Sequence, residues 1–244
     1  MVSWVYSVCD RIGTVLLPSR CLLCHGPGAV RGRDLCGDCE ADLPWSTAPC
    51  PRCGLPQPAS VPAPAAAGCE HCVGRAQPYR GCHAPFLYEF PLTELLPALK
   101  YRGALAHARV LGTLLAESIM RAGLHRDVDV VVPLPLHRSR LVERGFNQSF
   151  ELARFASATL HVGLDPCALQ RRRATAPQVG LPRDERSVNV RDAFVALPAR
   201  VSGRTVALLD DVVTTGATVA EATRALLAAG ARQVDVWCVA RATG

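Results

Sequence analysis

Four Cys-x-x-Cys pairs within the first 72 residues constrain this chain more than any other feature of its sequence. With 12 cysteines among 244 residues, chance would give about 0.6 such pairs. The first two pairs are 11 residues apart and the last two are 15 apart, close to the spacing of four-thiolate zinc sites. We therefore predict two structural zinc sites, built from Cys21, Cys24, Cys36, Cys39, Cys50, Cys53, Cys69 and Cys72. Sequential pairing is an assumption here, because interleaved pairing satisfies the same spacings.

Disulfides, a redox pair and a single zinc site are the alternatives for these cysteines. Asp10 and Arg11 interrupt the first apolar run and no small-residue cleavage site follows, so we expect no secretory signal. No apolar run is long enough to span a bilayer, and we expect a cytoplasmic protein with reduced thiols. A thioredoxin-like pair needs a βαβ context that is not seen here. The remaining cysteines are expected to be small buried side chains: Cys9, Cys82, Cys167 and Cys238.

The composition changes near residue 82, from Cys, Pro and Gly to helix and strand patterns. We expect an N-terminal helix and double zinc ribbon over 1–82 and a larger domain over 83–244. Apolar periodicity predicts helices over 92–102, 105–121, 147–160 and 217–229, and strands over 128–132, 205–209 and 233–240. The polar segment 171–192 is expected to be a long loop or a short ribbon, and long loops inside compact domains are often lids. Alternating strands and helices indicate an α/β domain with a mainly parallel sheet and helices on both faces.

The segment from Val206 to Thr218 is the most informative part of the larger domain. A buried strand leads to two adjacent carboxylates, Asp210 and Asp211, at the edge where open α/β sheets bind ligands. A hydroxyl-rich turn containing Gly216 then enters a helix, whose first N–H groups and dipole attract anions. Carboxylates beside a phosphate cradle suit a ribose 5-phosphate compound. An ordinary βα turn and a direct metal pair are the alternatives.

This segment resembles the 5-phosphoribosyl 1-pyrophosphate (PRPP) motif of type I phosphoribosyltransferases. The resemblance implies that the two acids contact the ribose 2′- and 3′-hydroxyls and that the turn holds the 5′-phosphate. It also implies Mg²⁺, carried mainly on pyrophosphate and ribose oxygens. The implied PRPP-binding residues are Asp210, Asp211, Val212, Val213, Thr214, Thr215, Gly216, Ala217 and Thr218.

Further motifs resemble the ComF family in the same order along nearly the whole chain. They are KYRG at 100–103, VPLPLH at 132–137, RGFNQ at 144–148 and RATAPQ at 173–178, after a cysteine pattern that matches the family's double zinc ribbon. The resemblance to ComFC-like members implies a PRPP- and Mg²⁺-binding protein with an accessory role in the uptake of transforming DNA. The alternative is an active phosphoribosyltransferase that transfers phosphoribose to an unknown base or amine and releases pyrophosphate. The sequence identifies no catalytic residue.

Family analogy also implies contacts to pyrophosphate, some of them from a lid. The residues concerned are Pro133, Leu134, Pro135, Arg144, Arg173 and Gln178. The alternative for Pro133, Leu134 and Pro135 is a proline-rich exit from a strand. The alternative for Arg144 is that its segment merely starts a helix. For Arg173 the alternatives are a solvated charge run and contact with a nucleic-acid backbone. Single-stranded DNA and DNA-uptake proteins are the macromolecular partners that the resemblance implies.

The basic residues exclude a Walker A site, and a closer count of the charge weakens the argument that a positive net charge indicates binding to nucleic acid. Only one of the 27 is a lysine, Lys100, and its neighbours do not form a Walker A motif. Lys100 and Arg102 either contact an anion or are drawn to a helix C-terminus. Each four-thiolate zinc site would contribute −2, which lowers the formal charge of +6 to about +2. Binding to nucleic acid therefore has to depend on local arginine clusters such as 171–173.

Overall fold

The computed structural model describes residues 19–28, 33–58, 68–74, 77–173 and 190–243. It divides the chain into two compact units, residues 1–43 and 44–244. The division after residue 82 that the composition indicates stays a prediction. Among the described residues, no helix is both long and apolar enough to cross a membrane.

The smaller unit is organised around its cysteines. Arg20 and Pro27 form an antiparallel bridge across the first Cys-x-x-Cys turn. Helix α2 (Gly37–Ala41) begins after Cys36, whose sulfur accepts a hydrogen bond from the N–H of Cys39 at 3.5 Å. A helix of five residues has little stability of its own. The helix therefore needs stabilisation beyond its own hydrogen bonds.

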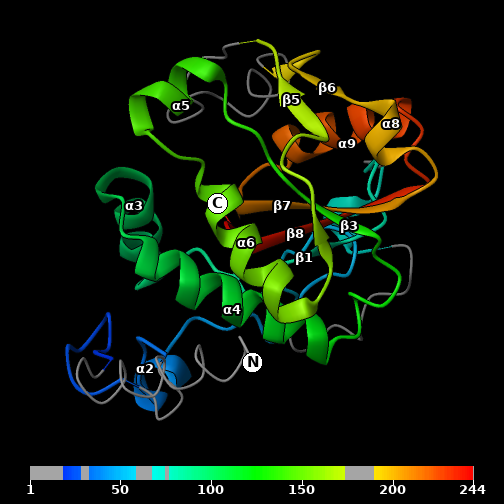
Figure 1. Ribbon diagram of the computed structural model, residues 1–244. Helices are drawn as coiled ribbons and strands as arrows, with labels where there is room; N and C mark the ends of the chain where they lie inside the picture. The colour runs from blue at the N-terminus through cyan, green and yellow to red at the C-terminus, as the bar shows by residue number, and fades with distance from the viewer. Residues whose placement is uncertain (1–18, 29–32, 59–67, 75–76, 174–189, 244) are drawn as a thin grey trace, which may run out of the picture. The chain divides into compact units, whose positions relative to one another are not determined.

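A six-stranded parallel sheet forms the centre of the larger unit (Figure 1). The strand order is β1-β8-β7-β3-β4, and β2 also pairs with β8. Strands β7 and β8 are almost entirely buried, as expected where helices cover both faces. The strands are β1 (Cys82–His83), β2 (Phe86–Leu87), β3 (Val130–Pro133), β4 (Gly163–Leu164), β7 (Thr205–Val213) and β8 (Gln233–Arg241).

Helices cover both faces of the sheet. Figure 1 shows α4 and α6 on one face and α9 on the other. Val206 and Leu208 of β7 pack with Val219 of α9 in one core cluster. A Cβ at Gly112 would lie 2.7 Å from the Leu152 carbonyl oxygen, so glycine permits the close packing of α4 on α6. The remaining elements are η1 (Glu70–Cys72), α3 (Leu92–Arg102), α4 (Leu105–Arg121), α5 (Arg138–Arg144), α6 (Gln148–Leu160), β5 (Leu169–Arg171), β6 (Phe194–Ala196), α8 (Pro198–Val201) and α9 (Ala217–Ala228).

The α/β prediction is confirmed, with differences at the ends of two strands. Helices α3 and α4 have the predicted bounds, whereas β3 begins at Val130 and includes Pro133. Strand β7 continues to Val213, past the predicted end at Leu209, because it stays paired with β8 as far as Arg241. The acid pair therefore lies inside the strand and not beyond it.

The unpaired cysteines have two different environments. Cys82 and Cys238 are buried, as predicted. The expectation for Cys167 is wrong, because this residue is exposed in a turn, where its N–H donates to Asp165 Oδ1 at 2.9 Å. Cys9 lies outside the described residues.

Candidate functional site

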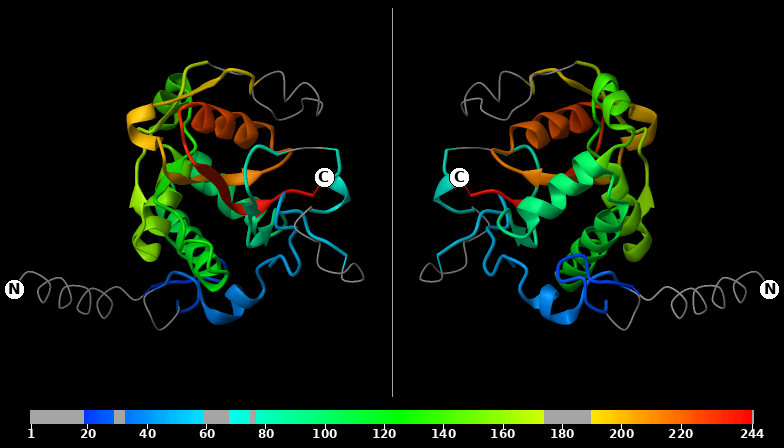
Figure 2. Two further views of the ribbon diagram at one scale, coloured as in Figure 1. Left: turned by 90° about the vertical axis from the view of Figure 1, so that its right-hand side faces the viewer. Right: turned by 90° about the vertical axis from the view of Figure 1, so that its left-hand side faces the viewer.

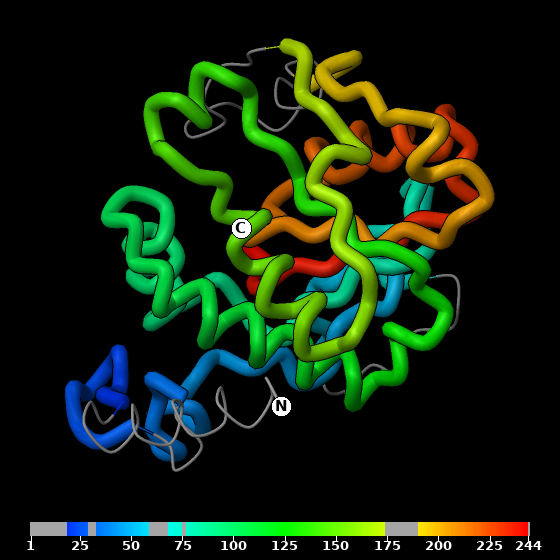
Figure 3. Tube along the Cα trace, in the orientation of Figure 1, coloured from blue at the N-terminus to red at the C-terminus, as the bar shows by residue number. Residues whose placement is uncertain are grey.

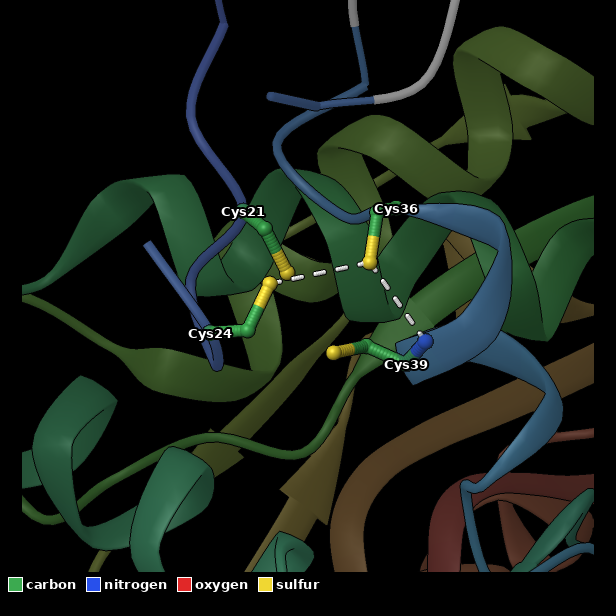
Figure 4. A group of neighbouring side chains, drawn as sticks. All are labelled: Cys21, Cys24, Cys36 and Cys39. Carbon is green, nitrogen blue, oxygen red and sulfur yellow. Dashed lines mark hydrogen bonds between the residues drawn. The ribbon is translucent and has the colours of Figure 1, made fainter. Parts of the chain in front are cut away.

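The first four-cysteine cluster consists of Cys21, Cys24, Cys36 and Cys39 (Figure 4). Their sulfur atoms all lie within 4.8 Å of one another, and those of Cys24 and Cys36 are 3.7 Å apart. Four thiolates at the usual Zn–S distance of about 2.3 Å would have sulfur atoms about 3.8 Å apart. The donor set and its geometry therefore fit a tetrahedral zinc ion.

The second cluster, formed by Cys50, Cys53, Cys69 and Cys72, is buried throughout. Its sulfur separations are 3.9 Å for Cys50 to Cys72 and 3.6 Å for Cys53 to Cys69. Burial opposes ionisation of Cys50, but backbone N–H donors outweigh it and lower the pKa to about 7. The structure thus groups the cysteines sequentially, which answers the pairing question. A closed shell of four sulfurs suits a structural ion and leaves no position for substrate.

The acid pair lies in β7 with partners from two helices. Asp210 and Asp211 are buried, at 7% and 4% exposure. Asp210 Oδ1 accepts hydrogen bonds from Ser149 Oγ of α6 at 3.0 Å and from the Asp211 N–H at 2.8 Å. Lys100 of α3 brings its Nζ to 2.5 Å from Asp211 Oδ2. The anion that Lys100 contacts is therefore a carboxylate of the protein itself.

Burial and neighbouring charges shift the pKa values of Asp210 and Lys100. Burial first, and then the neighbouring charge of Asp211, raise the pKa of Asp210 to about 8. Burial disfavours the charge on Lys100, but Asp211 and Asp210 outweigh it and raise its pKa. Burial thus favours the protonated form of Asp210, while Lys100 contacts Asp211.

The variant Asp210→Asn is expected to flatten the dependence of stability on pH. The folded-state pKa of Asp210 is raised above an unfolded value near 3.9, so the folded protein keeps a proton that the unfolded chain has released. Wild-type stability should therefore fall between about pH 4 and pH 8, by at most about 1.4 kcal/mol per pH unit. Urea unfolding at several pH values measures this slope.

Asp127→Asn is the control for that experiment, since its side chain is 77% exposed. Its slope should equal that of the wild type, because the substitution changes a surface side chain and leaves Asp210 in place. An unchanged slope in Asp210→Asn would show that Asp210 is ionised in the folded protein.

A short turn carries the chain from β7 into α9, as the tube in Figure 3 traces. We call residues 214–218, which the sequence predicts to hold a phosphate, the phosphate turn. Gly216, with φ +82°, is the N-cap of α9 and provides no side chain to cap it, while Thr215 Oγ1 accepts from the Ala217 N–H at 3.4 Å. The first N–H groups of a helix have no acceptor within it. The turn is therefore suited to an anion that accepts from several donors.

The predicted PRPP residues form one continuous strand, turn and helix start, but they differ in what they expose. Val213 is buried in the core beneath α9, so its side chain is structural. Val212 is half-buried within β7. Ala217 and Thr218 open the first turn of α9. The groups that can contact a ligand are therefore the two carboxylates and the phosphate turn.

The residues expected to contact pyrophosphate lie on different segments of the larger unit, and one of them is not described by the structure. Pro133 ends β3, and the next residue, Leu134, donates its N–H to the Leu209 carbonyl at 2.8 Å. Pro135 follows in the connection to α5. The Nη2 of Arg173 donates to the Arg191 carbonyl at 2.5 Å. Gln178 lies outside the described residues.

The segment at 144–148 starts a helix. Asn147 caps α6, because its Oδ1 accepts from the Ser149 N–H at 3.0 Å, and its Nδ2 donates to the Leu134 carbonyl at 3.0 Å. Arg144 donates to Gln148 Oε1 at 2.5 Å. These contacts hold Ser149 where it reaches Asp210. The segment therefore starts a helix, while a contact of Arg144 with pyrophosphate stays a prediction.

Sequence reasoning missed one contributor to this site, Ser149 of α6. Burial lowers the pKa of Arg171, nearby Asp210 opposes that shift, and Arg140 and Arg173 reinforce it. The arginine run was a visible signal, whereas nothing in the sequence marks Ser149, because its partner lies on a different element.

Comparisons with known proteins agree with this two-part chemistry. Residues 12–73 match a family model described as a double zinc ribbon domain, and residues 106–242 match one described as uracil phosphoribosyltransferase. DNA utilization protein YhgH of Escherichia coli (strain K12) is 36% identical over 230 residues, which cover 92% of this chain and 98% of that protein. Competence protein F of Haemophilus influenzae is 28% identical over 228 residues, covering 91% and 97%.

Among solved structures, the glutamine phosphoribosylpyrophosphate (PRPP) amidotransferase from B. subtilis is similar over 53% of this chain and 25% of its own. The identity is 22% and the TM-score is 0.35, which is too low to support an inference about this chain.

Proposed function

Since this chain belongs to the ComF family, with a double zinc ribbon and a phosphoribosyltransferase-type domain, we propose that its larger unit binds PRPP together with Mg²⁺. The observation that carries the proposal is the buried acid pair, Asp210 and Asp211, directly ahead of an uncapped helix N-terminus at Gly216. Carboxylates that accept hydrogen bonds from hydroxyl groups, next to a site for an anion, suit a phosphorylated sugar.

Each part of the site then has a role. Asp210 and Asp211 accept hydrogen bonds from the ribose hydroxyls, and the phosphate turn donates its N–H and threonine hydroxyl groups to the 5′-phosphate. Mg²⁺, when bound, compensates charge on the pyrophosphate. Carboxylates are hard oxygen donors and compatible with Mg²⁺, although this proposal assigns it no protein ligand. The two four-cysteine clusters hold zinc and stabilise the fold.

The positive side chains around the acid pair complete this assignment. Lys100 compensates Asp211 while the site is free of ligand, so the acid pair can remain buried before PRPP arrives. The charge of Asp210 favours the charged form of Arg171, and a guanidinium group suits the pyrophosphate oxygens.

A ligand series in thermal unfolding tests the proposal. PRPP with Mg²⁺ should stabilise the protein by about 2.7 kcal/mol at 100 times its Kd, which corresponds to a rise in Tm of roughly 5–10 °C. Ribose 5-phosphate should stabilise less and pyrophosphate least, because each fills only part of the site. Equal shifts with all three ligands would indicate nonspecific anion binding and would oppose the assignment.

For the cellular role we propose an accessory function in DNA uptake, acting from the cytoplasm. Support comes from relatives named for DNA utilization and competence and from the exposed arginines Arg172 and Arg173. Single-stranded DNA and DNA-uptake proteins are the proposed partners. Aromatic residues make up only 5% of the sequence, so few side chains are available to stack on DNA bases, and protein docking stays as an alternative to direct DNA contact.

If DNA is bound directly, affinity for a labelled single strand should fall at least 10-fold between low and physiological salt. Arg172→Gln combined with Arg173→Gln should weaken binding and reduce the salt slope by about 1 to 2. Arg224→Gln, which is exposed on α9, is the matched control. Absent or salt-insensitive binding would reject direct DNA contact and leave protein docking as the accessory role.

The second candidate function is phosphoribosyl transfer with release of pyrophosphate. Its support is the match to a uracil phosphoribosyltransferase model over 106–242. Positioning and charge compensation would do most of the work, because PRPP already carries a good leaving group. Pyrophosphate release, assayed with uracil and with other bases and amines, decides this candidate. PRPP binding without turnover would favour the accessory role.

A further inference from the structure

Arg241, the last residue of β8, is a charged side chain buried to 3% exposure. Its Nε donates a hydrogen bond to the carbonyl of Cys53, in the second cluster, at 2.9 Å. Its Nη1 donates to the carbonyls of Val213, at 2.8 Å, and of Thr214, where β7 passes into the phosphate turn. A buried guanidinium is costly unless its donors are satisfied. One side chain therefore joins the second cluster to the start of the phosphate turn.

Those bonds set the direction of the donors in the turn. In a planar trans peptide, the C=O and the following N–H point in opposite directions. When Arg241 holds the carbonyls of Val213 and Thr214, the N–H groups of Thr214 and Thr215 must point away from Arg241. Arg241 is thereby placed to aim these two donors toward a ligand without touching it.

Two more contacts join the same parts of the larger unit. The Cys82 N–H of β1 donates to the Pro51 carbonyl, inside the second cluster, at 3.1 Å. Tyr79, buried on the chain between that cluster and β1, brings its hydroxyl to 3.5 Å from the position of a Cβ on Gly216. Figure 2 shows the chain around the second cluster, in cyan, beside the red end of β8.

We infer that Arg241 is a positioning residue for the phosphate turn, and that the second cluster, when it holds zinc, fixes Arg241 through the Cys53 carbonyl. The first cluster lies in the other unit. The inference deepens the proposed function and depends on it only for the identity of the ligand. Zinc in the second cluster thus supports phosphate binding from a distance, without contacting phosphate.

Arg241→Met tests the inference, with Arg232→Met as the matched control. Arg232 lies just before the opposite end of β8, is 64% exposed and donates to Thr205 Oγ1 at 2.7 Å. Three quantities are measured: zinc content, affinity for PRPP with Mg²⁺, and amide exchange at Ala220 and Ala242. Those two amides bond to the carbonyls of Gly216 and Val213, so they report on the turn without a ligand.

Arg241→Met should retain two zinc ions, exchange both amides at least 10-fold faster and bind PRPP at least 10-fold more weakly. Arg232→Met should match the wild type. Cys53→Ser should lose one zinc ion and reproduce the change in the turn, whereas Cys39→Ser should lose one zinc ion without it. If the methionine variant does not fold, Arg241→Lys, which has fewer donors in a different geometry, should show the faster exchange.

Wild-type exchange in a folded Arg241 variant would overturn the positioning role. Equal changes in Cys53→Ser and Cys39→Ser would overturn the link to the second cluster. If the wild type does not bind PRPP, the proposed function fails, and the exchange rates alone still decide the inference.

Discussion

Replacing Lys100 with methionine is expected to lower the free energy of unfolding by about 3 kcal/mol at neutral to alkaline pH. Its ammonium lies 2.5 Å from Asp211 Oδ2, with the two side chains 22% and 6% exposed. Removing one partner of a buried ion pair leaves the other charge uncompensated, at a cost of about 3–5 kcal/mol. The lower end applies because Lys100 is partly exposed. Urea unfolding measures the change.

A control on the same helix tests whether the loss belongs to the ion pair. Arg102→Met, an exposed site on the same helix, should change stability by no more than about 0.5 kcal/mol. A loss equal to that of Arg102→Met would mean that the ion pair contributes nothing.

Cys50→Ser is expected to lower the stability of the larger unit by about 3 kcal/mol, or roughly 10 °C in Tm. Structural zinc contributes about 10–16 kcal/mol in small zinc domains, so the loss of one ligand in four costs a sizeable part of it. All four sulfurs of this cluster are buried, and its chain is bonded to β1 and to Arg241. Thermal unfolding followed by circular dichroism measures the effect, with zinc content determined in parallel.

Cys36→Ser provides the comparison within the same protein. It removes a ligand from the first cluster, in the smaller unit, so the main unfolding transition of the larger unit should keep its midpoint. Equal losses in the two variants would contradict a separate role for the second cluster. A chelator should reproduce the loss in the wild type.

Local features of the site could be predicted from the sequence because they lie within short stretches. Cys-x-x-Cys turns bring two sulfurs together through the backbone alone, and the spacing of the pairs limits which turns can meet. The acid pair and the turn at Gly216 belong to one strand, turn and helix, so a linear motif specifies them.

Contacts between distant segments could not be predicted in the same way. The pairing of Lys100 with Asp211 depends on where α3 ends relative to β7, and the bond from Ser149 to Asp210 depends on how α6 packs on the sheet. Helix α5 was missed because it has seven residues and buries none of them. Nothing in the sequence marks Arg241, near the end of the chain, yet its guanidinium donates to four backbone carbonyls.

The central claim is that the acid pair and the phosphate turn form a PRPP site, and calorimetric titration of PRPP with Mg²⁺ tests it most directly. The wild type should bind one PRPP per chain. The double variant Asp210→Asn with Asp211→Asn should bind at least 100-fold more weakly, while circular dichroism shows that it remains folded. No heat of binding in the folded wild type, or equal affinity in the folded double variant, would contradict the claim.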